Sequence, residues 1–250
     1  MNYLGIKPVR PRVAIFGFTG CEGCQLQLAN GEEDLAEFLS AMRIARFREL
    51  SSADEEAYDI ALVEGAVTRG DEEERLLEIR DRARVLVALG SCACYGGVPR
   101  LKNCFDPVEM NHEVYGCHPR ESLPTRSLRE IVTVDQEIPG CPVAKVEVER
   151  IIQHLIWGLP YRFPAYPVCL ECKQRYILCR FEQGELCLGP LTRGGCLATC
   201  PRGGLGCWGC RGPAAEPNYG EFIAIARQRG FTLREIKERL SFFGGLEVTP

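Results

Sequence analysis

Eight cysteines lie within residues 169–210, and no other feature of the sequence constrains the fold as strongly. The segment has little hydrophobic periodicity and few large apolar residues, so we expect it to lack a core of its own and to depend on bound metal for order. Eight thiols make two sets of four, the ligand number of structural zinc and of cubane iron–sulfur clusters. The eight are Cys169, Cys172, Cys179, Cys187, Cys196, Cys200, Cys207 and Cys210.

The spacing of these cysteines favours iron over zinc. Zinc ribbons usually carry two C-x2-C pairs about a dozen or more residues apart, whereas here the ligands are spread more evenly along the segment. Proline follows both Cys141 and Cys200, as it follows the last cysteine of ferredoxin motifs. Frequent glycines let backbone N–H groups approach cluster sulfur. A zinc-binding interaction module is the less favoured alternative, and a disulfide framework ranks below both.

Apart from its cysteines, the chain has the composition of an ordinary globular protein. Of 250 residues, 46% are hydrophobic, 26% are charged and 15 are cysteine, and the formal net charge is -4. The absence of a basic stripe argues against nucleic acid as a partner, and no apolar run is long enough for membrane insertion. No secretory leader is recognisable, so we expect a cytoplasmic protein, in which clustered cysteines favour metal or redox roles over disulfides.

The amino-terminal half alternates between strand-like and helix-like patterns. Near-continuous apolar strands separated by helices indicate a parallel sheet covered on both faces. In one of the predicted helices, Leu76, Leu77, Ile79 and Ala83 are expected to face inward. Strands are predicted at Arg12–Phe18, Met42–Leu50, Tyr58–Ala66, Arg84–Ala93 and within 129–142, and helices at Gln25–Ser40, Glu72–Ala83 and Glu147–Leu159.

The remaining segments define the predicted domain organisation. Residues 95–125 are rich in glycine, proline, asparagine and cysteine, which predicts a long functional loop. The proline-rich stretch Pro160–Pro167 marks a domain boundary, and the tail Tyr219–Phe243 carries one or two helices. We therefore predict an α/β fold, with a flavodoxin-like parallel-sheet domain over residues 1–163 and a mostly irregular and α cluster-binding domain over residues 164–250.

A second group of cysteines follows the predicted strands of the first domain. Cys21 and Cys24 come after the first strand, Cys92 and Cys94 after the fourth, and Cys141 after the last. Ligands of doubly wound sheets lie outside the carboxyl ends of the strands, so four of these five thiols are expected to converge on one cluster. Packing of thiols as small hydrophobes would explain one or two of them, but not their collection at strand ends.

Taken together, these motifs resemble the small, electron-transferring subunit of nickel–iron hydrogenases. The most similar branch is the cytoplasmic, bidirectional one of sulfhydrogenase delta and F420-non-reducing hydrogenase small subunits. The resemblance covers roughly Val13 to Pro213, in both halves and in the same order. The motifs that carry it are TGCEGC, VEGA, GSCACYGGVP and IPGCP in the first half, and PVCLEC, CLGPLTRGGC and CWGCRGP in the second.

The resemblance implies three 4Fe-4S clusters. The proximal cluster would use Cys21, Cys24, Cys92 and Cys141, the medial cluster Cys196, Cys200, Cys207 and Cys210, and the distal cluster Cys169, Cys172, Cys179 and Cys187. Some relatives have proline at the position of Cys200 and hold a three-iron medial cluster, so cysteine here implies a fourth iron. Cys94, Cys104 and Cys117 are left without an assigned role, as bystander thiols.

The resemblance also implies partners. Hydrogen would be activated on a large subunit, and electrons would pass from the proximal to the medial and distal clusters. A further subunit, of the NAD(P)-linked diaphorase type or the heterodisulfide-reductase-linked type, would receive them. The alternative is the iron–sulfur subunit of a complex-I-like oxidoreductase. That subunit has adjacent cysteines in its first loop and lacks the eight-cysteine extension, which argues against this alternative.

Several residues near the predicted ligands have more than one interpretation. Glu22 would repel the proximal cluster or face the partner, and Glu64 is either a proton-path or interface carboxylate or a cap for the strand-end loop. The helix that begins near Cys24 is expected to offer free N–H donors to the cluster charge. Trp208 is expected to shield the medial cluster from water.

Overall fold

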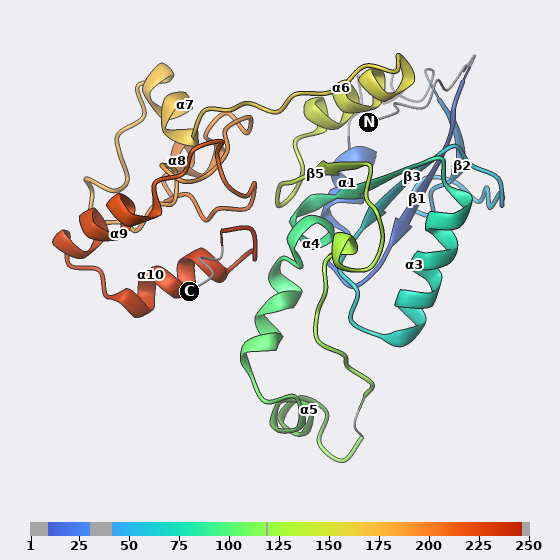
Figure 1. Ribbon diagram of the computed structural model, residues 1–250, viewed down its shortest axis with the longest axis horizontal. Coiled ribbons are helices and arrows are strands. Elements are labelled where there is room, and N and C mark those ends of the chain that lie inside the picture. The colour runs from blue at the N-terminus through green and yellow to red at the C-terminus, as the bar shows by residue number, and fades with distance from the viewer. Residues whose placement is uncertain (1–9, 31–41, 119, 247–250) are drawn as a thin grey trace. The chain divides into compact units, whose positions relative to one another are not determined.

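A computed structural model describes residues 10–30, 42–118 and 120–246 of the chain (Figure 1). The chain divides into two compact units, Met1–Tyr161 and Arg162–Pro250, and each is described by itself. Part of the predicted helix Gln25–Ser40 is present as α1 (Gly23–Ala29), whereas its later positions from 31 onward lie outside the described residues.

The first unit is built on a five-stranded sheet whose paired strands all run parallel. The spatial order is β2-β1-β3-β4-β5, which is the flavodoxin-like order with its switch point between β1 and β3. This confirms the predicted α/β class. The strands are β1 (Arg12–Gly17), β2 (Arg43–Arg46), β3 (Ile60–Glu64), β4 (Val85–Leu89) and β5 (Gln136–Ile138).

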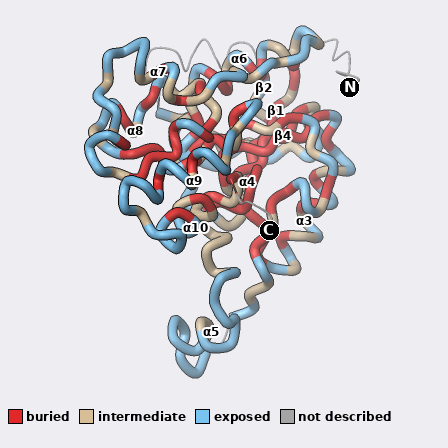
Figure 2. Tube along the Cα trace, turned by 60° about the vertical axis from the view of Figure 1, so that its left-hand side comes forward, coloured by how far each residue is buried: buried red, intermediate tan, exposed pale blue. Residues whose placement is uncertain are grey.

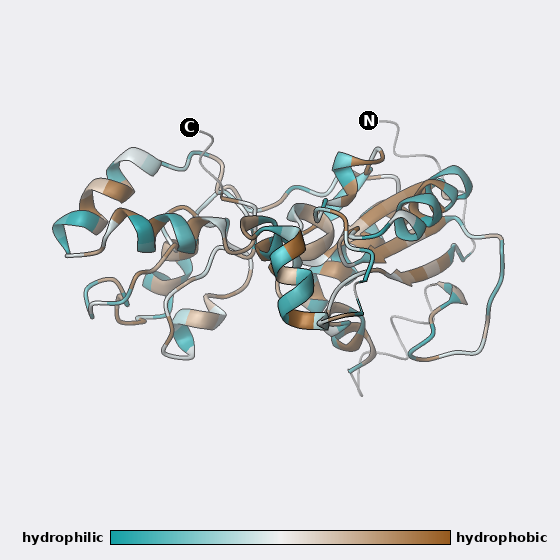
Figure 3. Cartoon of the chain, turned by 90° about the horizontal axis from the view of Figure 1, so that it is seen from below, coloured by the Kyte–Doolittle hydropathy of each residue, from teal (hydrophilic) through white to brown (hydrophobic). Residues whose placement is uncertain are grey.

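Helices cover the sheet on both faces. The helix α3 (Gly70–Arg82) lies on the opposite side of the sheet from α1 and α6 (Lys145–Ile156), as Figure 1 shows. All residues of β3 and β4 are buried, and the strands are the brown, hydrophobic ribbons of Figure 3. Burial on both faces explains why these strands have continuous rather than alternating apolar sequences.

One side-chain orientation in α3 differs from the prediction. Leu76 and Ile79 are buried against the sheet, whereas Leu77 is 51% exposed. Helical residues three and four apart share a face, and the next residue in sequence is rotated by about 100°. The expectation that Leu77 faces inward is therefore wrong.

The region after β4 is more ordered than the sequence predicts. The predicted strand Arg84–Ala93 ends at Leu89, and the short helix α4 (Gly90–Tyr95) follows it. The predicted loop contains the 3₁₀-helix η1 (Val98–Cys104) and the helix α5 (Pro107–Tyr115). Asp106 caps α5, because its Oδ1 accepts N–H bonds from Val108 and Glu109, both at 2.9 Å. Figure 2 shows α5 as an exposed projection.

The second unit contains four helices within the described residues, joined by irregular segments. They are α7 (Val168–Gln174), α8 (Thr199–Arg202), α9 (Tyr219–Gln228) and α10 (Leu233–Ser241). Apolar residues of the cysteine-rich segment, such as Leu188, share a core with Phe222 of α9 and Ile236 of α10. The segment therefore has core packing that its own sequence did not predict, because the tail helices supply part of it. No helix in the described ranges is long and apolar enough to cross a membrane.

Candidate iron–sulfur cluster sites

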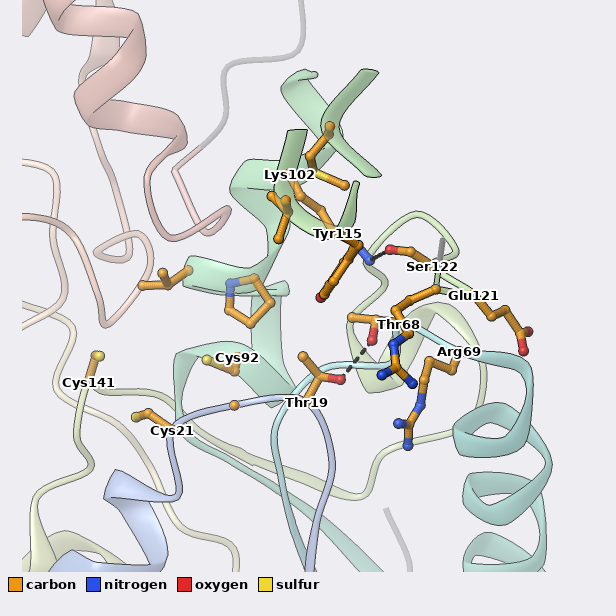
Figure 4. Close-up of a pocket in the computed structure, with 16 residues that line it drawn as sticks. Thr19, Cys21, Thr68, Arg69, Cys92, Lys102, Tyr115, Glu121, Ser122 and Cys141 are labelled. Carbon is orange, nitrogen blue, oxygen red and sulfur yellow. Dashed lines mark hydrogen bonds between the residues drawn. The ribbon is translucent and has the colours of Figure 1, made fainter. Parts of the chain in front are cut away.

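The four predicted proximal cysteines gather at the carboxyl edge of the sheet. Cys21 follows β1, Cys24 lies in α1, Cys92 lies in α4, and Cys141 follows β5. Figure 4 shows Cys21, Cys92 and Cys141 close together at one side of a cavity of about 1080 Å³. The parallel arrangement produces this convergence, because every strand ends at the same edge.

Two glycines let the backbone approach these sulfur atoms. Gly90 has φ +87°, and a Cβ there would lie 2.5 Å from the Sγ of Cys24. Gly97 has φ +57°, and a Cβ there would lie 2.6 Å from the Sγ of Cys92. Any side chain would enter the space next to the thiols, so glycine is required at both positions for steric as well as conformational reasons.

Glu64 at the end of β3 holds the start of α1. Its carboxylate is 4% exposed and accepts the backbone N–H of Cys24 at 2.9 Å and that of Gln25 at 3.1 Å. These two first-turn N–H groups are therefore not free for a cluster, and that expectation is corrected. Glu64 therefore caps the start of α1, and not the strand-end loop that the sequence suggested. Glu22 is exposed, with φ 60° and no side-chain cap to the helix.

Burial favours the protonated form of two of the proximal thiols, those of Cys92 and Cys24. It raises the pKa of Cys92 to about 12, and the neighbouring charges of Cys141 and Cys21 act in the same direction. Burial and then the charge of Glu64 raise the pKa of Cys24 as well. A bound iron ion reverses this balance because it stabilises the thiolate.

The predicted distal cysteines are also mutual neighbours. Burial raises the pKa of Cys169 to about 12, and the charges of Cys187, Cys172 and Cys179 add to the shift. Burial likewise raises the pKa of Cys172 to about 11, with contributions from Cys187 and Cys179. A Cβ on Gly189 would lie 3.2 Å from the Sγ of Cys169 and 3.4 Å from that of Cys187, so a glycine again lies against the sulfur atoms.

The predicted medial cysteines form two pairs of neighbours, Cys196 with Cys200 and Cys207 with Cys210. Burial and then the charges of Cys196 and Cys187 raise the pKa of Cys200, and burial followed by contributions that include Cys210 and Cys187 raises that of Cys207. The backbone N–H of Cys207 donates to the Sγ of Cys187 at 3.2 Å. This bond links the medial set directly to the distal set.

One buried carboxylate beside these sites escaped the sequence analysis. Glu171, between two of the predicted distal ligands, is 2% exposed and accepts the N–H of Gly195 at 2.6 Å and that of Ala198 at 2.9 Å. It thereby fixes the loop that carries Cys196. No sequence signal predicts this, because the bonded residues are 24 and 27 positions away.

The cysteines left without a role lie in different surroundings. Cys94 belongs to the hydrophobic core of the first unit, and its Sγ donates to the carbonyl oxygen of Ala88 at 3.6 Å. Cys104 and Cys117, before and after α5, are exposed. Trp208, expected to be a shield, lies 36% exposed, with its ring 4.9 Å from that of Phe242.

The donor sets fit cubane clusters in their chemistry. Each set offers four thiols, the ligands that such clusters take, and glycine backbone lies against sulfur atoms of the proximal and distal sets. In the described part of the chain, no three His, Cys, Asp or Glu side chains are close enough to hold one metal ion. In a cubane cluster, each thiolate binds a different iron atom, so its four ligands are spaced more widely than those of a single ion.

A flavodoxin-like sheet with thiols at its carboxyl edge, joined to a cysteine-rich unit, defines an iron–sulfur electron-transfer subunit of an oxidoreductase. Comparison with known proteins agrees with this class. Residues 21–155 match the family described as NADH ubiquinone oxidoreductase, 20 Kd subunit. The chain is 37% identical over 225 residues to sulfhydrogenase 2 subunit delta of Pyrococcus furiosus, a match that covers 87% of this chain and 92% of the relative.

Two further matches extend the comparison. The chain is 32% identical over 234 residues to a subunit of the vhu F420-non-reducing hydrogenase of Methanocaldococcus jannaschii, which covers 80% of this chain and 81% of the relative. A chain in the crystal structure of an NAD+-reducing nickel–iron hydrogenase in the H2-reduced state aligns with a TM-score of 0.57 at 28% identity, covering 62% of this chain and 96% of that one. The chain therefore belongs to the hydrogenase small-subunit family, in the sulfhydrogenase delta and F420-non-reducing hydrogenase branch.

Proposed function

We propose that this chain relays electrons between the hydrogen-activating site of a nickel–iron large subunit and an acceptor-reducing subunit, through three 4Fe-4S clusters. The proximal cluster is assigned to Cys21, Cys24, Cys92 and Cys141, the medial cluster to Cys196, Cys200, Cys207 and Cys210, and the distal cluster to Cys169, Cys172, Cys179 and Cys187. The convergence of four thiols that follow three strands, β1, β4 and β5, at one edge of the sheet, with Gly90 against Cys24, carries the proposal.

The bound clusters supply one-electron redox chemistry, and the residues of the chain hold and insulate them. Glu64 fixes the start of α1 and so the position of Cys24. Glu171 fixes the loop of Cys196. Burial of Cys187 and Cys207 limits the access of water to the second unit's thiols, and solvent exposure is one of the properties that set cluster potentials.

The cavity beside the proximal thiols supports docking of the large subunit on that face. Its lining includes Val98, Val114 and Tyr115, all of which are exposed. The exposed Phe105, just before α5, lines a neighbouring cavity that shares Met110 and Val114 with this one. Exposed apolar side chains grouped on one projection are typical of a protein–protein interface. A partner bound here reaches the edge of the sheet where Cys21, Cys92 and Cys141 lie.

We propose two types of subunit as the acceptor-reducing partner. A cytoplasmic complex with a diaphorase-type subunit would pass electrons to NAD(P), and one with a heterodisulfide-reductase-type subunit would pass them to a disulfide. The names of the relatives, each a subunit of a hydrogenase, support assembly with other hydrogenase subunits but do not distinguish these two types. The 15 cysteines, most of them clustered at ligand spacings, fit a reducing compartment, where such thiols hold metal more often than they form disulfides.

Anaerobic purification of the chain with its bound partners tests the proposal. We expect about twelve iron atoms and about twelve labile sulfides per chain, the content of three cubane clusters, together with a nickel-containing protein. Two zinc ions without sulfide would instead support the zinc module, and iron without a nickel partner would support the complex-I-like alternative. In the variant Cys200→Pro we expect loss of about one iron and the electron paramagnetic resonance signal of a three-iron cluster.

A further inference from the structure

An arginine on the tail helix α10 lies against both predicted cluster sites of the second unit. Thr232 and Glu235 form a capping box at the start of this helix, and Ile236 and Leu240 bury one of its faces in the core. The helix is therefore fixed in rotation, and Arg239 is held half-buried next to Leu240. This helix lies outside the cysteine motifs.

The guanidinium of Arg239 joins two chain segments. Its Nη1 donates to the carbonyl oxygen of Leu186 at 2.9 Å, and its Cζ lies 3.4 Å from the centre of the Trp208 ring. Leu186 precedes Cys187 and Trp208 follows Cys207. A distal and a medial ligand are thus both next to residues that Arg239 contacts.

These two segments are paired directly with each other. The N–H of Leu188 donates to the carbonyl oxygen of Cys207 at 2.9 Å, and the N–H of Cys207 donates to the Sγ of Cys187 at 3.2 Å. Arg239 lies across this pairing, so its charge is close to both ligands. Consistent with that position, Cys187 and Cys207 both act on the pKa of Arg239 in the direction that favours its charge.

The carboxylates around Arg239 are engaged elsewhere. Glu185 pairs with Arg180 and accepts the N–H of Gly206. Glu238 pairs with Arg234, and Glu235 bonds to Thr232. Across the described ranges, no carboxylate forms an ion pair with Arg239. Burial is the largest influence on the pKa of Arg239 and lowers it, and Glu185 offsets only part of this shift, from beyond ion-pair distance.

Clusters held by Cys187 and Cys207 would add negative charge close to the guanidinium of Arg239. A cubane with four thiolates carries a net negative charge, and reduction adds one more unit. A fixed cation nearby stabilises the reduced form more than the oxidised form and so raises the reduction potential. Stacking on Trp208 contributes a cation–π interaction that holds both side chains in place.

We propose that Arg239 is a positioning residue whose fixed positive charge raises the reduction potentials of the medial and distal clusters, while its stacking keeps Trp208 packed beside Cys207. This inference depends on the proposed function, because it requires clusters in the second unit. It assigns an electrostatic role to a helix that contributes none of the predicted ligands.

Redox titration of the purified complex, followed by electron paramagnetic resonance, tests the inference. In Arg239→Met we expect the oxidised-to-reduced ratio of the medial and distal clusters at a given potential to rise about tenfold, a shift of about 59 mV for a one-electron couple. Arg239→Lys keeps the positive charge but loses the planar stacking on Trp208. The reduction potentials of both clusters should therefore stay close to those of the unaltered chain. Lys237→Met, which removes one exposed charge from the same helix, is the matched control and should leave both potentials unchanged.

The outcomes distinguish this inference from the proposed function. Unchanged potentials in Arg239→Met with full iron content would overturn it, and so would equal shifts in Arg239→Lys and Arg239→Met. If Arg239→Met loses its clusters, Arg239→Gln replaces it, because glutamine can still donate to the carbonyl oxygen of Leu186. The same shift in the two reduction potentials is then expected, and unchanged potentials would again overturn the inference. Absence of second-unit clusters in the unaltered chain would instead refute the proposed function, and the iron count alone reveals it.

Discussion

In the first unit, the predicted cluster ligands follow strands β1, β4 and β5, whose backbone hydrogen bonds form without metal. In the second unit, the cysteines lie largely in irregular segments, and Cys187 and Cys207 are members of the hydrophobic core. Cys172 and Cys196 pack against that core. A sheet that forms without metal can therefore hold its cysteines in position before a cluster binds. A segment with little regular structure instead depends on its cysteines and on the metal they bind to complete its core.

Removal of the clusters is expected to have the largest effect and tests this contrast directly. A chelator with a reductant should unfold the segment between α7 and α9, because bonds to metal contribute to its folding free energy. The amides of β1, β3 and β4 should stay protected, because these strands are fully paired. Hydrogen exchange measured by mass spectrometry, before and after treatment, reports both units at once. Equal loss of protection in the two units would refute the distinction.

Substitution of one glycine should disable the proximal site while leaving the second unit intact. In Gly90→Ala, the new Cβ would lie 2.5 Å from the Sγ of Cys24 at φ +87°. We expect loss of proximal iron in addition to the strain of about 1–2 kcal/mol for a left-handed residue. Gly230→Ala is the matched control, since φ is +92° there and nothing lies within 4 Å of the added Cβ. Iron analysis and thermal unfolding of both variants separate the steric effect from the conformational one.

The two buried carboxylates provide a smaller and more specific test. Glu64→Gln and Glu171→Gln each weaken a pair of charge-assisted N–H bonds, at a cost of about 1–3 kcal/mol. We expect Glu64→Gln to lower the unfolding free energy of the first unit and Glu171→Gln to speed the loss of medial iron to a chelator. The exposed Glu182→Gln is the control. A reversed pattern, with Glu64→Gln affecting medial iron, would contradict the local roles of these residues.

The pH dependence of the cluster-free chain should show the smallest effect. The pKa of the Cys92 thiol is raised from 9.0 to about 12 by burial in the folded state. A raised folded pKa means stability that is present below pH 9 and lost as pH rises toward about 12, because only the unfolded chain releases the proton easily. Urea unfolding of the first unit between pH 7 and 11 should show this decline, and Cys92→Ala should reduce its slope. Rising stability above pH 9 would be inconsistent with a buried thiol.

The regular part of the fold could be predicted because its signals are local. The apolar runs of β1, β3 and β4 indicated buried parallel strands, and the structure confirms them. The prediction was wrong where a short apolar helix, α4, continues directly from β4, because periodicity over six residues does not distinguish a buried helix from a buried strand. The helix α5 was missed because its nine residues mix apolar and polar types without a clear period and lie in a stretch rich in glycine and proline.

The candidate sites could be predicted only as far as their cysteines. Spacing and the position of each cysteine relative to a strand predicted the thiols that meet at the sheet edge. Glu171 and Arg239 carry no such signal, because a carboxylate in a short helix and an arginine in an amphipathic tail helix are ordinary residues in sequence. Their roles depend on loops that pack against them from elsewhere in the chain.

The sequence by itself determined the α/β class, the placement of cysteines after strands and membership of the hydrogenase small-subunit family. These properties are contained in short windows of residues and in motif order. Only the tertiary structure decided that Glu64 caps α1 from 40 residues away and that Arg239 bonds to Leu186 across 53. The physical reason is that such hydrogen bonds form only between groups that packing has already brought together, so their partners cannot be inferred from neighbours along the chain.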